Sequence, residues 1–254
     1  MKLTEPVSGG PCWVELSTPD IPAAKTFYAA LFGWRSETDP REEAGGYTMA
    51  HVGDARVAAL SPVYQPGQHP AWTVSFATED ADAAVEKVTA AGGSQLVGPM
   101  DVFDAGRFAV VADPSGAVFS LWQGRAFAGT DLLNEPGSLG WVELVAREAD
   151  PALAFYPAVF GWTVTASKTY PQWGVDGADF GGLLANDEML PPEAPPNWLP
   201  YFAVADADAT AATAQSAGGE MIMPPTTLPG GRQIAVVRDP QGAVFGIYRA
   251  GEEG

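Results

Sequence analysis

The chain has 254 residues, 46% of them hydrophobic, which is enough for one large domain or two ordinary ones with buried cores. Its 13 basic and 31 acidic residues give a net charge of −18. A field of that sign repels phosphate backbones and anionic membranes, so we expect the protein to bind neither nucleic acid nor membrane.

The N-terminal residues contain no apolar signal segment, and no run is long enough to span a bilayer. The one cysteine, Cys12, cannot form an internal disulfide and is interpreted as a small apolar strand residue. Both features are typical of a cytoplasmic protein, and we expect that location.

The first predicted strand covers residues 12–17. Alternation places Trp13, Glu15 and Ser17 on one face, and the apolar residues Val14 and Leu16 on the other. A helix capped by Asp20 follows and ends at Gly33. Three short strands come next, near residues 34–37, 47–51 and 56–62. The result is one β-α-β-β-β module.

A second module with the same order follows a loop rich in proline and glutamine. Its first strand is predicted at residues 72–78, and its helix runs from about Asp80 to Ala91. Three further strands are predicted at residues 95–101, 107–112 and 117–123. The last two are joined by Asp-Pro-Ser-Gly, which is typical of a tight turn.

A polar connector, residues 127–137, separates this pair of modules from a second copy of the pattern. Trp141-Val142-Glu143-Leu144 repeats Trp13-Val14-Glu15-Leu16, and Asp239-Pro240 repeats Asp113-Pro114. The repeat predicts two domains, residues 1–126 and 138–254. They contain four modules, at about residues 11–63, 71–125, 139–186 and 197–250.

Three stretches of text carry a family resemblance: the Phe-Tyr…Phe-Gly-Trp end of the first helix, Ala-Gly-Gly after the second, and Asp-Pro-x-Gly-Ala-Val-Phe before the last strand. Together they resemble the vicinal oxygen chelate superfamily, which includes glyoxalase I, bleomycin resistance proteins and extradiol dioxygenases. The chain is most similar to tandem two-domain actinobacterial glyoxalase-like proteins. The resemblance covers about residues 11–250. It implies an α+β fold in which four βαβββ modules pair into two incomplete, mixed-sheet barrels, with helices outside and a pocket within.

Metal-dependent members of that superfamily hold a divalent ion with His or Glu side chains at three strand positions. Carried over to this sequence, those positions fall at Trp13, near Thr73 and at Ser120 in the first half, and at Trp141, near Leu199 and at Gly246 in the second. None of these side chains is a normal metal ligand. His51 and His69 are interpreted as ordinary solvated histidines. We therefore expect no divalent metal and no other cofactor.

Strand alternation and the resemblance together predict a concave surface of aromatic and small polar side chains, as a planar organic ligand requires. The predicted ligand-binding residues are Trp13, Glu15, Thr73, Ser75, Ser120, Trp122, Trp141, Glu143, Tyr201 and Tyr248. By contrast, Trp34 and Trp162 are predicted core residues. Trp72 and Trp198 are predicted on the opposite face, in packing or at a module interface.

Glu15 and Glu143 permit two interpretations, because a carboxylate on a half-buried strand needs a partner or water. In the first, they meet an arginine such as Arg107 or Arg232, or lie solvated at the pocket mouth. In the second, they anchor a cation or hydroxyl of a ligand, or act as a general base with a raised pKa. Arg107 and Arg232 themselves are expected on surface hairpins.

Three functions follow from these features. The first is a metal-independent binding protein of the bleomycin-resistance type, which holds an aromatic or hydrophobic metabolite such as an antibiotic or polyketide. The second is an enzyme of secondary metabolism, a glyoxalase-like lyase or isomerase or an oxygenase-associated enzyme, with Glu15 or Glu143 as its candidate catalytic residue. The third is a non-catalytic scaffold. The duplication supplies an internal pseudo-dimer, so the chain is expected to be a monomer or a homodimer.

Overall fold

The computed structural model describes residues 6–65, 67–167, 169–185 and 194–251. In the first half, the strands and helices follow the predicted order and lie within a residue or two of the predicted bounds. They are β1 (Pro11–Thr18), α1 (Ile21–Phe32), β2 (Arg35–Thr38), β3 (Thr48–Val52), β4 (Ala55–Pro62), β5 (Ala71–Ala77), α2 (Ala81–Ala90), β6 (Ser94–Val102), β7 (Gly106–Ala112) and β8 (Val118–Gly124).

The second half repeats this order. Its elements are β9 (Leu139–Ala146), α3 (Asp150–Phe160), β10 (Thr163–Thr165), β11 (Gln172–Val175), β12 (Ala178–Ala185), β13 (Asn197–Ala203), α4 (Ala207–Ser216), β14 (Glu220–Thr227), β15 (Gln233–Arg238) and β16 (Val244–Arg249). The predicted Asp20 cap is present, and Asp80 and Asp206 cap α2 and α4 in the same way: each side chain accepts a backbone N–H three residues on.

Each half forms its own eight-stranded mixed sheet. The strand order is β2-β3-β4-β1-β5-β8-β7-β6 in the first half and β10-β11-β12-β9-β13-β16-β15-β14 in the second. The central strand β1 runs parallel to β4 and antiparallel to β5, and β9 does the same with β12 and β13. Both sheets are open. The prediction of an α+β fold with four modules in two incomplete barrels is therefore confirmed.

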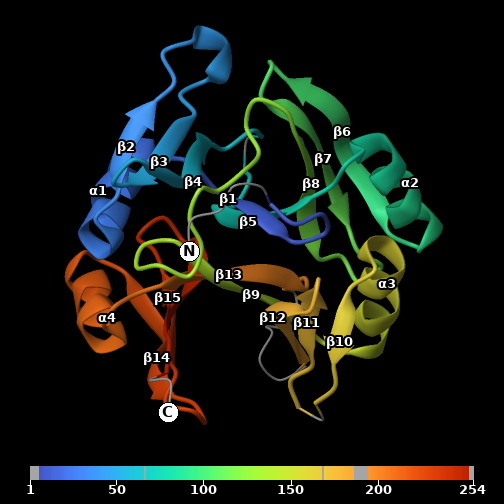
Figure 1. Ribbon diagram of the computed structural model, residues 1–254. Coiled ribbons are helices and arrows are strands. Elements are labelled where there is room, and N and C mark those ends of the chain that lie inside the picture. The colour runs from blue at the N-terminus through green and yellow to red at the C-terminus, as the bar shows by residue number, and fades with distance from the viewer. Residues whose placement is uncertain (1–5, 66, 168, 186–193, 252–254) are drawn as a thin grey trace.

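The two curved sheets pack against each other through their convex faces, and their helices lie outside them. In Figure 1, α1 and α4 flank one side of the molecule, and α2 and α3 flank the other. Strands β5 and β13 contact each other between the sheets. The rings of Phe76 and Trp162 lie 5.0 Å apart, and those of Phe32 and Phe202 also 5.0 Å. One hydrophobic core is thus shared by both halves, and each such buried side chain contributes about 1.5–3 kcal/mol.

Polar contacts cross this shared core in symmetric pairs. The indole N–H of Trp34 donates to the Gly137 carbonyl at 2.7 Å, and that of Trp162 donates to Gly9 at 2.7 Å. Each bond joins a tryptophan at a helix end to the segment that leads into the other half. The predicted core positions of Trp34 and Trp162 are confirmed. Trp72 and Trp198 also lie in the core between the sheets, as predicted for the face opposite the pocket.

Candidate functional site

The concave face of each sheet is the face turned away from the shared core. Val14 and Leu16 lie in that core, so the alternating residues Trp13 and Glu15 project from the other face of β1. Trp141 and Glu143 are their counterparts on β9. The sequence therefore predicted correctly that each pair shares one face.

Glu15 is held by hydroxyl groups from three directions. The Ser61 hydroxyl donates to Glu15 Oε1 at 2.9 Å, and the Tyr64 hydroxyl donates to the same oxygen at 3.0 Å. Tyr47 also hydrogen-bonds to this carboxyl group and accepts the indole N–H of Trp13 at 3.1 Å. Burial raises the pKa of Glu15 above its ordinary value, and the hydroxyl donors only partly offset that effect.

Glu143 has an equivalent arrangement built from tyrosines. The Tyr170 hydroxyl donates to Oε1 at 2.8 Å, and the Tyr201 hydroxyl donates to Oε2 at 3.0 Å. Tyr170 accepts the indole N–H of Trp141 at 2.9 Å, so the Trp–Tyr–Glu unit of the first half is repeated. Burial again raises the pKa, since only 6% of Glu143 is exposed.

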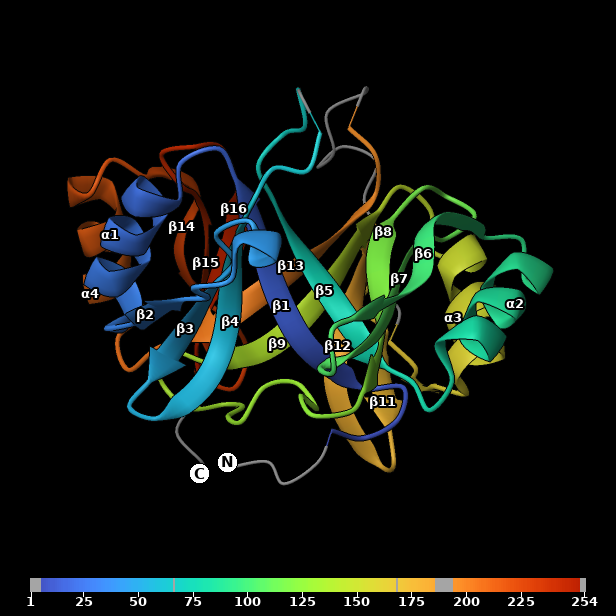
Figure 2. The same cartoon turned by 90° about the horizontal axis from the view of Figure 1, so that it is seen from above.

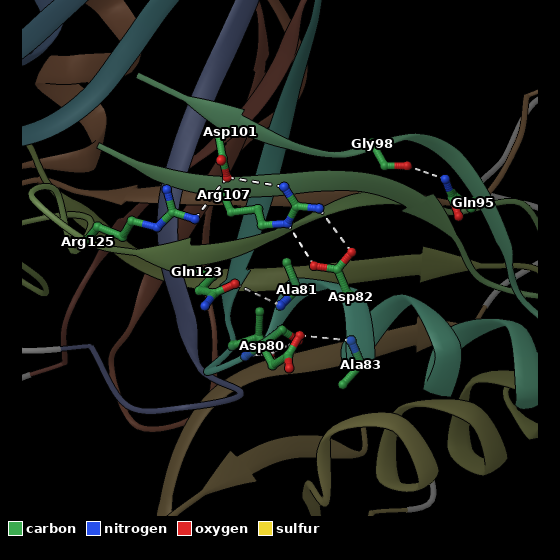
Figure 3. A network of polar contacts seen from close by, with 11 residues as sticks. Asp80, Ala81, Asp82, Ala83, Gln95, Gly98, Asp101, Arg107, Gln123 and Arg125 are labelled. Atoms are coloured by element: carbon green, nitrogen blue, oxygen red, sulfur yellow. Dashed lines mark hydrogen bonds and ion pairs between the residues drawn. The ribbon is translucent and has the colours of Figure 1, made fainter. Parts of the chain in front are cut away.

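The interpretation in which an arginine, Arg107 or Arg232, pairs with these glutamates is wrong: in the described part of the chain neither arginine forms an ion pair with Glu15 or Glu143. Figure 3 shows that Arg107 extends to the outside of the first half, where it pairs with Asp82 at 2.7 Å and Asp101 at 3.2 Å. This confirms its expected role on a surface hairpin. Among the described residues, the side-chain partners of Glu15 and Glu143 are uncharged hydroxyl groups. Sequence spacing could not show this, because the donors come from other strands and loops.

The remaining predicted residues lie along the same faces. Ser75 and Ser120 are register partners on β5 and β8 and are both buried. Thr73, Trp122 and Tyr248 are half-buried. Four residues of these sites were not predicted from the sequence: Tyr47, Ser61, Tyr64 and Tyr170. Tyr47 and Tyr170 stand at matching places before β3 and β11, and an alignment of the two halves that allowed a shortened hairpin could have paired them.

The connector between the halves is less polar than the sequence suggested. Phe127 is buried against Trp13, with ring centroids 4.8 Å apart and an interplanar angle of 85°. The Trp122 indole N–H donates to the Phe127 carbonyl at 2.9 Å. Arg56 lies over the phenyl ring, 4.7 Å from its centroid, and pairs with Asp131 at 2.8 Å. Part of the connector therefore belongs to the concave face of the first sheet.

Tyrosines covering glycines occupy the corresponding face of the second half. A Cβ atom on Gly246 would lie 2.1 Å from the Tyr201 ring, and one on Gly182 would lie 2.4 Å from the Tyr170 ring. The absence of these Cβ atoms lets both rings lie flat on the sheet and reach Glu143. The first half has Ser120 at the position of Gly246, so the two faces are built differently.

The donor set does not fit a divalent metal. The carried-over positions hold Trp13, Thr73 and Ser120 in one half and Trp141, Leu199 and Gly246 in the other. In the described part of the chain, no group of three or more His, Cys, Asp or Glu side chains is close enough to hold an ion.

His51 differs from its prediction as a solvated histidine. It lies on β3 and is 8% exposed. Its Nδ1 has no hydrogen-bond partner among the described residues. Cys12 is buried, as predicted for a small apolar strand residue, and burial raises the pKa of its thiol.

Two surface hollows lie away from the concave faces. One, of about 470 Å³, lies between α1 and the β2–β3 hairpin and includes Ile21 and Thr48; its counterpart beside α3, of about 530 Å³, includes Ala149 and Pro171. None of the predicted ligand-binding residues lines either hollow. The described helices are all too short or too polar to cross a membrane.

Comparison with known proteins gives matches over both halves. The family model described as "Glyoxalase/Bleomycin resistance protein/Dioxygenase superfamily" matches residues 11–121 and 138–247. A protein of Mycobacterium tuberculosis named "Putative glyoxylase CFP32" is 41% identical over 98% of this chain and 97% of its own length. The "Anthracycline biosynthesis protein DnrV" of Streptomyces peucetius is 37% identical over 98% of this chain and 96% of its own.

Two solved structures share the fold at low sequence identity. The Mn(II)-bound glyoxalase from Novosphingobium aromaticivorans has a TM-score of 0.68 and 18% identity, covering 97% of this chain and 83% of that one. The 2,3-dioxygenase LapB from Pseudomonas sp. KL28 has a TM-score of 0.68 and 12% identity, covering 97% of this chain and 94% of that one. These likenesses concern the fold alone.

Proposed function

The chain belongs to the glyoxalase/bleomycin resistance protein/dioxygenase superfamily, and from that premise we propose that it binds an aromatic or hydrophobic small molecule without a metal ion. The observation that carries the proposal is the buried carboxyl group, held by tyrosine hydroxyls, beside a half-buried tryptophan on a concave face. A flat apolar ligand needs such a wall, and a polar anchor fixes its orientation.

Apolar side chains continue this wall beyond the glutamate in the second half. Ile234 and Val236 on β15 are register neighbours of Tyr248 and Gly246 on β16. They alternate with Ala235 and Val237, which lie in the shared core, so Ile234 and Val236 are on the concave side. Both are half-buried, which leaves apolar surface for a ligand to cover.

Glu143 is the proposed anchor. Each carboxylate oxygen can accept more than one hydrogen bond, so the two tyrosine donors leave acceptor capacity for a hydroxyl or ammonium group. The net charge of −18 favours a neutral or cationic ligand. The relative named for anthracycline biosynthesis supports an aromatic metabolite. Glu15 is the equivalent carboxyl group in the first half, held by the Ser61 and Tyr64 hydroxyls.

Binding of planar aromatic compounds to protein dialysed against a chelator tests the proposal. The expected result is micromolar binding that Glu143→Gln weakens by about tenfold, equivalent to about 1.4 kcal/mol. Glu86→Gln on the exposed surface of α2 is the matched control and should bind as the wild type does. Binding that requires added Mn²⁺, Fe²⁺, Ni²⁺ or Zn²⁺ would overturn metal independence.

A catalytic role is the second candidate, because burial raises the pKa of both glutamates towards the range of a general acid or base. Its test is turnover of a bound compound. If Glu143→Gln abolishes turnover and leaves affinity within twofold, the residue is catalytic. If the wild type binds compounds and converts none of them, the binding function stands alone.

We place the protein in the cytoplasm, which the single buried Cys12 supports.

A further inference from the structure

Trp13 and Trp141 occupy equivalent positions but have different surroundings. The Trp13 indole is 5% exposed and is covered edge to face by the Phe127 ring. The Trp141 indole is half-buried, and no aromatic ring in the described part of the chain packs against it. The same indole surface is therefore covered in the first half and left more open in the second.

Phe127 is fixed in place from several sides. Its carbonyl accepts the Trp122 indole N–H, and its ring lies under the Arg56 guanidinium group. Farther along the connector, the Thr130 N–H donates to the Cys12 carbonyl at 2.7 Å, and the Asp131 N–H donates to the Arg56 carbonyl at 2.9 Å. Figure 2 shows this yellow-green segment running along one edge of the molecule, past the ends of β1 and β4. The phenyl ring is thus a built-in occupant of the first concave face.

The second half keeps the supporting parts of this arrangement. Trp141 is oriented by Tyr170 as Trp13 is by Tyr47, through an indole N–H bond in each case. After β16, the described chain turns towards the β14–β15 hairpin, where Arg249 donates to the Gly231 carbonyl. The connector turns in the same way in the first half, where the Arg125 and Phe127 N–H groups donate to the Ala105 carbonyl of the β6–β7 hairpin. The residue that matches Phe127 in the repeat is Glu253, which lies outside the described residues.

The two halves also carry opposite charges at one equivalent position, which is Arg56 in the first half and Asp179 in the second. Arg56 stands three residues before Ala59, the register partner of Glu15, and Asp179 stands three residues before Gly182, the register partner of Glu143. A carboxylate thus replaces the guanidinium group that lies over the Phe127 ring. An aromatic ring with a positive charge or an ammonium substituent would complement Asp179.

We propose that the second half carries the ligand site, in which an aromatic, preferably cationic, ring lies on Trp141 as Phe127 lies on Trp13, and that Phe127 closes the first half. This inference rests on the proposed function and narrows it to one ligand per chain. Phe127 then acts as an internal substitute for the ligand and indicates its chemical class.

Calorimetric titration with 9-aminoacridine, a planar aromatic cation, tests the stoichiometry. We expect one site per chain in the wild type and two in Phe127→Ala, because removal of the ring exposes Trp13. Phe103→Ala is the matched control: Arg41 also lies over the Phe103 ring, at 4.0 Å, but that ring is exposed on a turn. It should keep one site. Two sites in the wild type, or one site in folded Phe127→Ala, would overturn the proposal.

Hydrogen exchange on the wild type covers the case in which Phe127→Ala does not fold. Bound 9-aminoacridine should slow exchange in β9 and β16 and leave β1 and β8 unchanged. Protection of β1 and β8 instead overturns this inference while the proposed binding function stands. No binding of 9-aminoacridine, nor of neutral 1,4-dihydroxyanthraquinone, overturns both. An anionic probe, anthracene-2-carboxylate, should bind at least tenfold more weakly than the cation, and equal affinity contradicts the role given to Asp179.

Discussion

The Tyr28 hydroxyl in the first half donates a 2.9 Å hydrogen bond to Asp239 Oδ2 in the second half. The Trp72 indole N–H donates to the same hydroxyl at 3.1 Å, so a tryptophan–tyrosine–aspartate chain crosses the shared core. The reciprocal bond from Tyr156 to Asp113 measures 3.1 Å. Burial raises the pKa of Tyr28 and of Asp239. The Phe-Tyr and Asp-Pro motifs, each of which occurs once in each half, thus contact each other across the two halves.

Tyr28→Phe should destabilise the protein by about 1–3 kcal/mol, because it leaves a buried carboxylate oxygen and a buried indole N–H without their partner. Urea unfolding measures the change. The control is Tyr248→Phe, since the Tyr248 hydroxyl makes no hydrogen bond to the described residues; it should change stability by less than about 0.5 kcal/mol. Equal effects of the two substitutions would show that the inter-half bond contributes nothing.

Glu143→Gln should change how stability depends on pH. The folded-state pKa of Glu143 lies above its ordinary value of 4.5, so the folded protein binds this proton more tightly than the unfolded chain does. Stability is therefore lost as pH rises from 4.5 through the raised folded pKa. The melting temperature of the wild type, relative to Glu143→Gln, should fall as the pH rises above 4.5. A difference between wild type and Glu143→Gln that stays constant with pH would refute this prediction.

Gly246→Ala should cost about 1–3 kcal/mol in the wild type, since the added Cβ meets the Tyr201 ring. The same substitution in a Tyr201→Ser background, which resembles the Ser75 of the first half, should cost less than about 1 kcal/mol. Thermal unfolding of the four proteins in this cycle gives the coupling. Equal costs in both backgrounds would mean that the ring moves away freely.

Arg56→Gln should loosen the connector without greatly destabilising the fold. The Arg56 and Asp131 side chains are each 35% exposed, so their ion pair contributes less than about 1 kcal/mol. Hydrogen exchange at Thr130 and Asp131 should nevertheless become faster. Arg35→Gln removes a more exposed ion pair with Glu37 and should leave exchange in the connector unchanged. Identical exchange in both variants would exclude a clamping role for Arg56.

Much of the fold could be predicted from local sequence signals. The internal repeat, the Asp20 cap and the strand alternation located the helices and strands to within a few residues, and placed Trp13 and Glu15 on one face. These signals suffice because they depend on short-range periodicity and on turn chemistry. The family resemblance supplied the pairing of four modules into two sheets but left open whether modules pair within or between the halves. The strand order shows that each sheet is built within one half.

The surroundings of the glutamates could not be predicted in the same way. Tyr47 and Tyr170 occupy equivalent places in the two halves. The number of residues between them differs from the offset of the surrounding repeat, because the hairpin is shorter in the second half. His51 was expected in solvent because its polarity outweighed its strand position. Phe127 was overlooked inside a polar connector, since nothing local indicates that a single phenylalanine will cross to a distant sheet.

The shared core also has a consequence for how the chain folds during synthesis. Phe76 and Phe32 pack against side chains that lie 86 and 170 residues later in the sequence, respectively. The first sheet therefore emerges from the ribosome with an aromatic surface that has no partner until the second half is made. Such long-range contacts slow folding and leave apolar surface exposed to aggregation. Truncated chains that end within the connector should accordingly depend on chaperones or self-associate.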